Sequence, residues 1–301
     1  MELTGLHILL TYVCNYECDH CFVWGSPWQS GTLTLEKIRH ILSQAEDVGT
    51  IKWIYFEGGE PFLYYPLLLE GVRESAERGF QVGLVTNVYW ANELEDALIW
   101  LRPFTGWVQD LSVSSDLYHG SEEMSRQAEN AREAADQLGI PIGVISIAQP
   151  MGSDAGVGQL PIGESGVMYR GRAAKKLIQQ AAQHPWTDFV ECPYEDLRDP
   201  GRVHLDPLGN LHICQGISIG NLFHKPLREI CEDYEPESHP IVGPLLEGGP
   251  VEIVRRYGLT HHEVYADACH LCYEARVELR DQFPEILTPD QVYGIFDEGQ
   301  D

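Results

Sequence analysis

The chain has 301 residues, 44% of them apolar, which is enough for one large domain or two smaller ones. Its 46 acidic and 20 basic residues give a net charge of −26, which disfavours nucleic acid as a partner and either aids solubility or suits a cationic substrate. No apolar run is long enough to span a bilayer and no signal peptide is evident, so we expect a cytoplasmic protein without a membrane partner.

Strand-like and helix-like stretches alternate over residues 1–175. A helical run at 33–49 opens with Thr34 and stops at Gly49, and a second covers 125–139. Apolar strand candidates lie at residues 6–13, 51–56, 81–87, 110–115, 140–148 and 166–170. This alternation predicts an α/β fold with a parallel sheet, and six units, short of a closed eight-unit barrel, predict a partial (β/α)6 TIM-like barrel.

The pattern changes after about residue 185. Residues 203–214 predict a β-hairpin, and a helical segment follows at 262–283. We therefore predict two domains, a barrel at 1–185 and a smaller C-terminal domain at 186–301.

Three cysteines, Cys14, Cys18 and Cys21, follow the first strand within eight residues. Clustered cysteines in a cytosolic chain are more often metal ligands or catalytic groups than disulfides. A [4Fe–4S] cluster needs four ligands, so three thiolates would leave one iron open for reaction. A zinc site is the alternative, although its usual signature is a C-x2-C pair with a matching partner pair.

The segment Phe56–Pro61, which reads FEGGEP, follows the second strand. Gly58 and Gly59 permit close approach of backbone to a ligand. Glu60 offers a carboxylate to an ammonium group, and Pro61 restricts the turn.

Together these two motifs resemble the signature of the radical S-adenosylmethionine (SAM) enzymes. The resemblance implies that the open iron is chelated by SAM, that residues 58–61 bind its amino group, and that His20 lies near the adenine. Weaker similarities add residues that would contact SAM, with capping, turn or surface positions as the alternative for each: Asn87, Ser112, Ser114, Arg170 and Arg172.

Four further cysteines come from distant segments: Cys192, Cys214, Cys269 and Cys272. Four thiolates can fully ligate a second cluster or a zinc ion. Their order around a hairpin resembles the twitch domain, a shortened SPASM domain that carries an auxiliary [4Fe–4S] cluster. The resemblance thus implies a twitch-like domain of hairpin and helix around a second cluster.

Cys231 is left over. It is either a small buried residue, a hydrogen-atom donor as in some radical SAM epimerases, or a misassigned cluster ligand.

The resemblance implies an oxidoreductase in which SAM is cleaved to a 5′-deoxyadenosyl radical that attacks an unactivated C–H bond. A fully ligated second cluster favours electron transfer, hence net oxidation of a small molecule, with a flavodoxin or ferredoxin as the reductase. Modification of a ribosomal peptide, by crosslinking or epimerisation, is the alternative, and with only 13 residues before Cys14 we expect no leader-peptide domain there. A non-enzymatic metal scaffold is the remaining alternative.

Overall fold

The structure is a computed structural model that describes residues 1–119, 122–150 and 165–296. Its central feature is an eight-stranded sheet of order β5-β4-β3-β2-β1-β7-β8-β9, and a separate two-stranded ladder joins β6 and β10. The strands are β1 (Leu3–Thr11), β2 (Trp53–Gly58), β3 (Gln81–Thr86), β4 (Val108–Ser114), β5 (Ile142–Ile145), β6 (His184–Pro185), β7 (Gly201–Leu205), β8 (Asn210–Cys214), β9 (Ile217–Asn221) and β10 (Val264–Tyr265).

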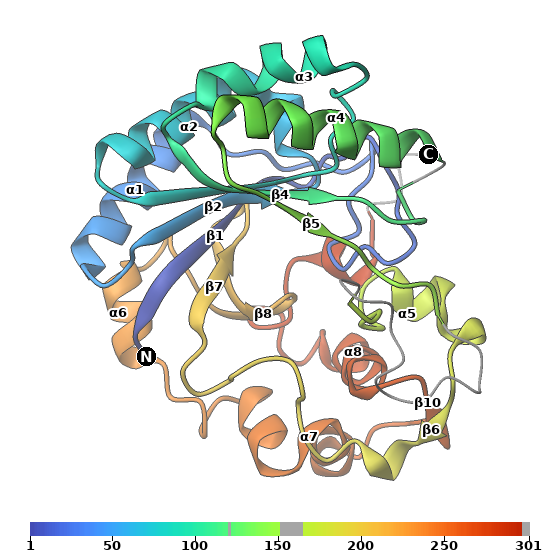
Figure 1. The fold of residues 1–301 in the computed structure, drawn as a ribbon. Coiled ribbons are helices and arrows are strands. Elements are labelled where there is room, and N and C mark those ends of the chain that lie inside the picture. Colours follow the sequence, from blue (N-terminus) through green and yellow to red (C-terminus); the bar gives the residue numbers. More distant parts are fainter. Residues whose placement is uncertain (120–121, 151–164, 297–301) are drawn as a thin grey trace.

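Strands β1 to β5 and β7 run parallel, whereas β7, β8 and β9 form an antiparallel meander. The sheet curves around a concave inner side (Figure 1). This arc confirms the α/β class and the partial barrel. Parallel strands place their carboxyl ends at one edge of the sheet, where the ligand sites of such folds lie.

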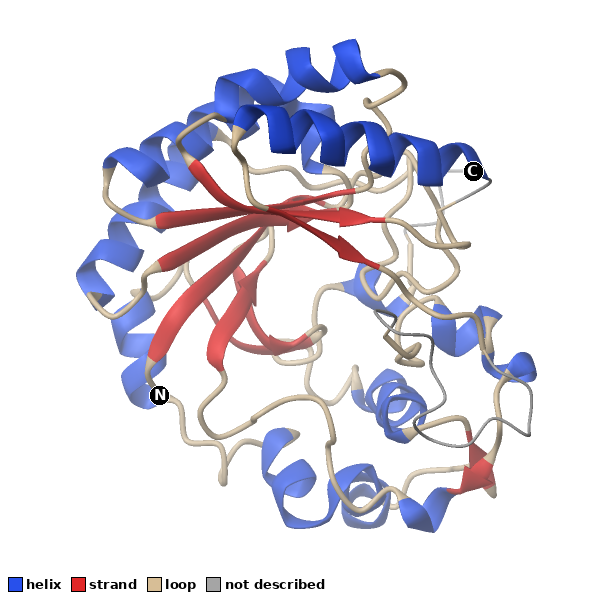
Figure 2. Cartoon of the chain, in the orientation of Figure 1, coloured by secondary structure: helices blue, strands red, loops and turns tan. Residues whose placement is uncertain are grey.

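Four helices cover the convex side of the sheet in the upper part of Figure 2 and follow β1 to β4 in turn. They are α1 (Leu35–Val48), α2 (Tyr65–Glu77), α3 (Leu94–Leu101) and α4 (Glu122–Leu138). Helix α1 begins where the Thr34 side chain accepts a hydrogen bond from the Lys37 amide, and it ends at Gly49 in the left-handed conformation. Both ends confirm the sequence prediction.

Helix α6 (Leu227–Asp233) lies beside α1 at the left of Figure 1, where the Leu227 amide donates to the Gln44 side chain of α1. The other later helices lie on the opposite side of the sheet, facing the concave surface (Figure 1). They are α5 (Ala173–Lys176), α7 (Val242–Tyr257) and α8 (Ala268–Leu279). Short 3-10 turns complete the described elements at Pro61–Tyr64, Arg102–Phe104, Ile178–Gln180, Trp186–Asp188 and Asp290–Tyr293. None of the helices among the described residues is long and apolar enough to cross a membrane.

The strand expected at 166–170 does not form. Only an isolated bridge joins Ile147 to Ser165, and the chain then turns across the cysteine loop, where the Arg172 amide donates to the Cys21 carbonyl. The hairpin expected at 203–214 is present as β7 and β8, and β7 pairs with β1. The division between residues 185 and 186 stays a prediction, and the sheet runs continuously across it.

Candidate active site

The cysteine triplet lies on the loop after β1, at the carboxyl edge of the sheet. The loop is held at its base by hydrogen bonds from the Tyr12 amide to Gly31 and from the Cys14 amide to Ser26. Backbone amides also point at the sulfurs: Gly25 N lies 3.2 Å from Cys21 Sγ. Tyr16 N lies 3.4 Å from Cys14 Sγ, so N–H donors lie beside the sulfurs of both Cys14 and Cys21.

Burial raises the pKa of the Cys14 thiol to about 12, and burial with repulsion from the other two cysteines raises the pKa of Cys18 as well. Thiolates are the metal-binding form, and a bound cation stabilises them. Without one, these thiols would stay protonated at neutral pH. The donor set therefore fits an iron–sulfur cluster held by three thiolates.

The glycines of the FEGGEP segment permit a close approach within the chain itself. A Cβ on Gly58 would lie 2.4 Å from Thr11 O, and one on Gly59 would lie 2.2 Å from Val13 O. Backbone hydrogen bonds join the same two segments: Gly59 N donates to Thr11 O, and Glu60 N donates to Val13 O. The glycines therefore let the loop after β2 pack tightly against the start of the cysteine loop.

The carboxylate of Glu60 is fully buried and turned inward, which departs from the expected role at an ammonium group. It accepts hydrogen bonds from Phe62 N, Thr86 Oγ1 and Asn87 N at 2.7–3.0 Å, and it caps the turn that Pro61 begins. Burial raises the pKa of Glu60 to about 7, against these donors. Glu60 thereby joins the ends of β2 and β3, while the backbone of Gly58 and Gly59 stays on the cavity wall.

A cavity of about 950 Å³ opens at the concave side of the sheet. It is large enough for a cofactor and a substrate together, since ligand sites usually measure about 300–1,000 Å³. Its described lining includes these residues from the sequence prediction: Cys14, Cys18, His20, Cys21, Gly58, Gly59, Asn87, Ser112, Ser114 and Arg170. Glu60, Pro61 and Arg172 are outside that described lining.

Asn87 links the end of β3 to the cysteine loop. Its amide nitrogen lies 2.9 Å from Asn15 Oδ1 and 3.7 Å from Cys14 Sγ. Arg172 instead supports the loop from outside the cavity, with its guanidinium donating to the Cys18 and Gly25 carbonyls at 2.7 and 2.8 Å. Both residues thus position the cysteines.

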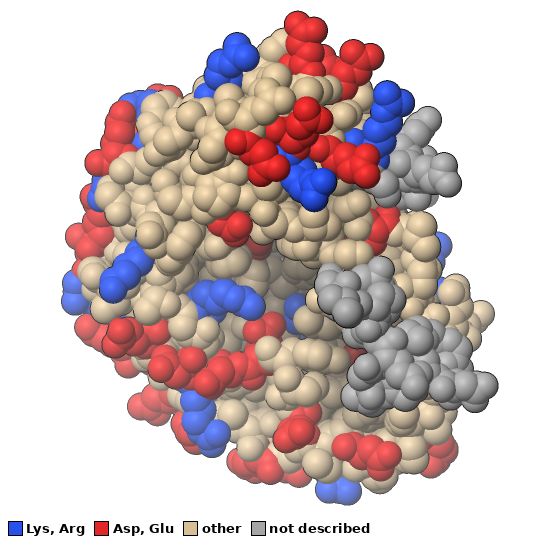
Figure 3. Space-filling view, in the orientation of Figure 1, with Lys and Arg blue, Asp and Glu red and all other residues tan. Residues whose placement is uncertain are grey.

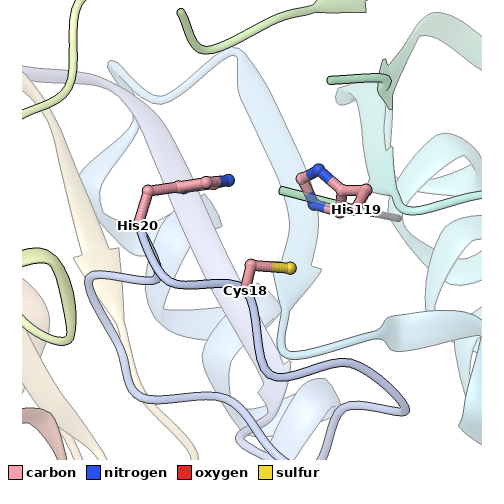
Figure 4. A group of neighbouring side chains, drawn as sticks. All are labelled: Cys18, His20 and His119. Atoms are coloured by element: carbon pink, nitrogen blue, oxygen red, sulfur yellow. The ribbon is translucent and has the colours of Figure 1, made fainter. Parts of the chain in front are cut away.

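His20 lies against the ring of Tyr118, with centroids 4.8 Å apart. Its Nε2 is buried and has no hydrogen-bond partner among the described residues, and burial lowers the pKa of this imidazole to about 4. The ring nitrogens of His20 and His119 and the sulfur of Cys18 come within 4.8 Å of one another (Figure 4). An alternative metal grouping of two imidazoles and one thiolate therefore exists at the mouth of the loop.

The four remaining predicted ligands, Cys192, Cys214, Cys269 and Cys272, line one small enclosed cavity. Cys214 ends β8, while Cys269 and Cys272 lie one turn apart in α8, whose first turn is capped by Asp267. The tertiary fold thus gathers cysteines separated by up to 80 positions, as the sequence reasoning expected.

Two buried cations flank these cysteines. Arg170 Nη1 lies 3.0 Å from Cys214 Sγ, and Arg276 lines the same cavity with 1% of its surface exposed. Although burial opposes it, the neighbouring Cys214 and Cys269 raise the pKa of Arg170. Buried guanidinium groups need negative partners, so four thiolates around a metal centre suit this site electrostatically. Arg170 also lines the large cavity and so stands between the two sites.

Cys231 lies away from both cysteine groups, in the apolar core beside Leu227 and Ile230. Its carbonyl accepts a hydrogen bond from the Met1 amino group, before β1, whereas the cysteine loop follows β1. A nine-residue strand spans about 30 Å. Cys231 is also outside the described lining of the large cavity. Its expected role as a hydrogen donor is therefore corrected to that of a small core residue.

Sequence reasoning missed a polar inner wall of the barrel. His7 on β1, Glu57 on β2 and His204 on β7 all line the large cavity, as do Tyr55 and Asp110. The signal was available, because His7 stands between buried Leu6 and Ile8, and Tyr55 and Glu57 alternate with buried Ile54 and Phe56. The apolar runs predict the strands, but the polar residues between them mark the face that lines the cavity.

Comparison with known proteins gives a match to the model of the radical SAM superfamily over residues 8–144. The chain is similar to "Putative peptide biosynthesis protein YydG" of Bacillus subtilis, 30% identical over 121 residues, covering 40% of this chain and 38% of that protein. It is also similar to the "Tungsten-containing aldehyde ferredoxin oxidoreductase cofactor-modifying protein" of Pyrococcus furiosus, 36% identical over 83 residues, which are 27% of this chain and 23% of that protein. The matches thus span well under half of either relative.

Among solved structures, BtrN in complex with AdoMet and 2-DOIA superposes with a TM-score of 0.48 and 14% identity, covering 76% of this chain and 83% of that one. SuiB of Streptococcus suis bound to the precursor peptide SuiA gives a TM-score of 0.47 and 12% identity, covering 89% and 76%.

Proposed function

We propose that Cys14, Cys18 and Cys21 hold the cluster at which SAM is cleaved and that the enzyme oxidises a small molecule, because residues 8–144 match the model of the radical SAM superfamily. When bound and reduced by one electron, the cluster and SAM would supply a 5′-deoxyadenosyl radical able to take a hydrogen atom from an unactivated C–H bond. The residues of the chain bind, orient and shield the reacting groups.

The positions of six cavity residues support this assignment. Asn87 orients Cys14 from the end of β3, and the backbone of Gly58 and Gly59 lies on the wall next to the cysteine loop. His20 forms a flat wall suited to the adenine ring, and Ser112 and Ser114 on β4 offer hydroxyls to the ribose or carboxylate of SAM.

The single observation that carries net oxidation is the second cysteine site. Four thiols line one enclosed cavity, so a [4Fe–4S] centre there would have every iron ligated by the protein. Such a centre suits the role of electron acceptor and leaves no iron for the substrate. Arg170 reaches from this site to the substrate cavity, which supports electron transfer between them.

The cavity wall favours a polar substrate. Asp110 offers a carboxylate to amino or hydroxyl groups, which agrees with the acidic charge of the chain. A flavodoxin or ferredoxin would supply the electron for SAM cleavage.

A peptide substrate is the second candidate, and the similarity to a protein named for peptide biosynthesis favours it. A cavity of this size also accepts one or two side chains of a peptide bound across its mouth. For either kind of substrate, the 5′-deoxyadenosyl radical would take the hydrogen atom from the substrate group that lies nearest the cysteine loop.

Anaerobic reconstitution tests the assignment. We expect about eight irons per chain and 5′-deoxyadenosine on reduction with dithionite and SAM. The double variant Cys269→Ala, Cys272→Ala should keep about four irons and still cleave SAM, whereas Cys14→Ala, Cys18→Ala, Cys21→Ala should lose cleavage. A colourless, zinc-filled chain would contradict the enzyme and support a metal scaffold. Loss of all iron in the double variant would contradict two separate sites.

A further inference from the structure

Two imidazoles and a carboxylate meet on the inner wall of the barrel, away from the cysteines. We propose that His7, Glu57 and His204 bind a single divalent metal ion of the zinc class. This site is additional to the proposed radical chemistry and does not depend on it.

Three adjacent strands create the group. His7 on β1 pairs with His204 on β7. Glu57 on β2 pairs with Leu9, which comes two residues after His7 and so lies on the same face of β1. Figure 1 shows β2, β1 and β7 side by side at the concave surface. Side chains two residues apart share a face of a strand, so the sheet itself fixes this convergence.

The distances suit a metal centre. His7 Nδ1 lies 3.2 Å from Glu57 Oε2, and His204 Nε2 lies 3.3 Å from Glu57 Oε1. Tetrahedral zinc with bonds of about 2.0–2.1 Å places neighbouring ligand atoms about 3.3 Å apart. Charge-assisted hydrogen bonds are shorter, about 2.7–2.9 Å. Because the two nitrogens face different oxygens, the carboxylate would bind through both or rotate to present one.

The surroundings fix the orientation of the His7 ring and leave space in the cavity for a further ligand to the metal. The His7 ring stacks on Tyr55 with centroids 4.5 Å apart, and Tyr55 donates a hydrogen bond to Asp110 Oδ2 at 3.0 Å. The three side chains are 13–17% exposed and face the large cavity. Three protein ligands with an open position describe a site that takes an exchangeable oxygen or nitrogen donor. A donor set without sulfur selects zinc or ferrous iron rather than a cluster.

The test uses the cluster-loaded protein, washed with a chelator, to which zinc chloride is added under anaerobic conditions. We expect one zinc per chain by elemental analysis, with X-ray absorption showing nitrogen and oxygen neighbours and no sulfur at about 2.3 Å. Competition with a chromogenic chelator should show affinity reduced by more than about tenfold in His204→Ala and in Glu57→Gln. His224→Ala, which changes an exposed imidazole outside the site, is the matched control and should bind as the parent does.

Several outcomes would overturn the proposal: no zinc above the washed background, sulfur in the first coordination sphere, or equal affinity in the parent and both site variants. Iron content and circular dichroism of the same samples show whether each variant is folded and holds its clusters. Because zinc is measured independently of SAM cleavage, failure here is distinguishable from failure of the proposed function. A hydrogen-bonded His–Glu–His triad without metal would then be the correct description.

Discussion

His20 has two possible roles at the cysteine loop, as a metal ligand or as a wall of the cofactor pocket. Its Nε2 is buried, has no hydrogen-bond partner in the part of the chain that the structure describes, and lies 3.8 Å from Asp116 Oδ2. With Cys18 and His119 it forms a grouping able to hold a metal ion (Figure 4). Either this imidazole ligates a metal, or it is a flat wall beside an open iron.

We expect His20→Phe to keep its iron and still cleave SAM, because phenylalanine preserves the flat wall and three thiolates suffice for the cluster. Total iron should stay near eight per chain, with cleavage within about a few-fold of the parent. Cys18→Ser is the matched control and should lose the iron of the N-terminal site. If His20→Phe lost about four irons, His20 would be a cluster ligand, and no open iron would remain for SAM.

At the scale of elements, the strand expected at 166–170 does not form, and the turn Arg170–Arg172 contacts both groups of cysteines instead. Gly171 has φ of +60°, and a Cβ there would lie 2.6 Å from both Cys21 O and Phe22 Cα. On either side of this turn Arg170 faces Cys214 and Arg172 faces Cys18 O. One short turn therefore braces both cysteine sites.

Gly171→Ala should displace the cysteine loop. The added methyl group would clash with the backbone of Cys21 and Phe22, and the Cys21 carbonyl already accepts a hydrogen bond from the Arg172 amide. We expect a loss of about 2–4 kcal/mol in the free energy of unfolding, from the left-handed conformation and the clash together, and less iron at the N-terminal site. Gly258→Ala is the matched control, since Gly258 has φ of +62° and a methyl group added there would meet nothing within 4 Å. Equal losses of stability and iron in both variants would show that the clash is unimportant.

At the scale of the molecule, the sheet joins the two predicted domains. Strand β7 covers the edge of β1, and Val203 and Leu205 are fully buried in the same core as Leu6 and Ile8. Acidic side chains are spread over the face in Figure 3, around a hollow with basic side chains at its rim. The second part of the chain therefore completes the sheet.

A fragment of residues 1–185 should therefore fail to fold independently. Its β1 would become an exposed apolar edge, which favours aggregation. We expect weak near-ultraviolet circular dichroism, dye binding to exposed apolar surface, and little retained iron after reconstitution. The full chain with Cys269→Ala and Cys272→Ala serves as the control, since it keeps the sheet while losing two ligands of the second site. A monomeric, cooperatively unfolding fragment with about four irons would support independent domains.

The sequence by itself determined the chemistry-bearing residues and the local elements. Cysteine spacing needs no tertiary information, because a three-thiolate loop is defined within eight residues, and helix ends such as Thr34 and Gly49 are fixed by neighbouring backbone groups. Only the tertiary structure decided what depends on strand neighbours. It turned Glu60 inward, placed Cys231 in the core, added β7 to β1, and so brought His7, Glu57 and His204 together. Strand order and side-chain direction arise from pairing between distant segments, which one strand's own residues do not specify.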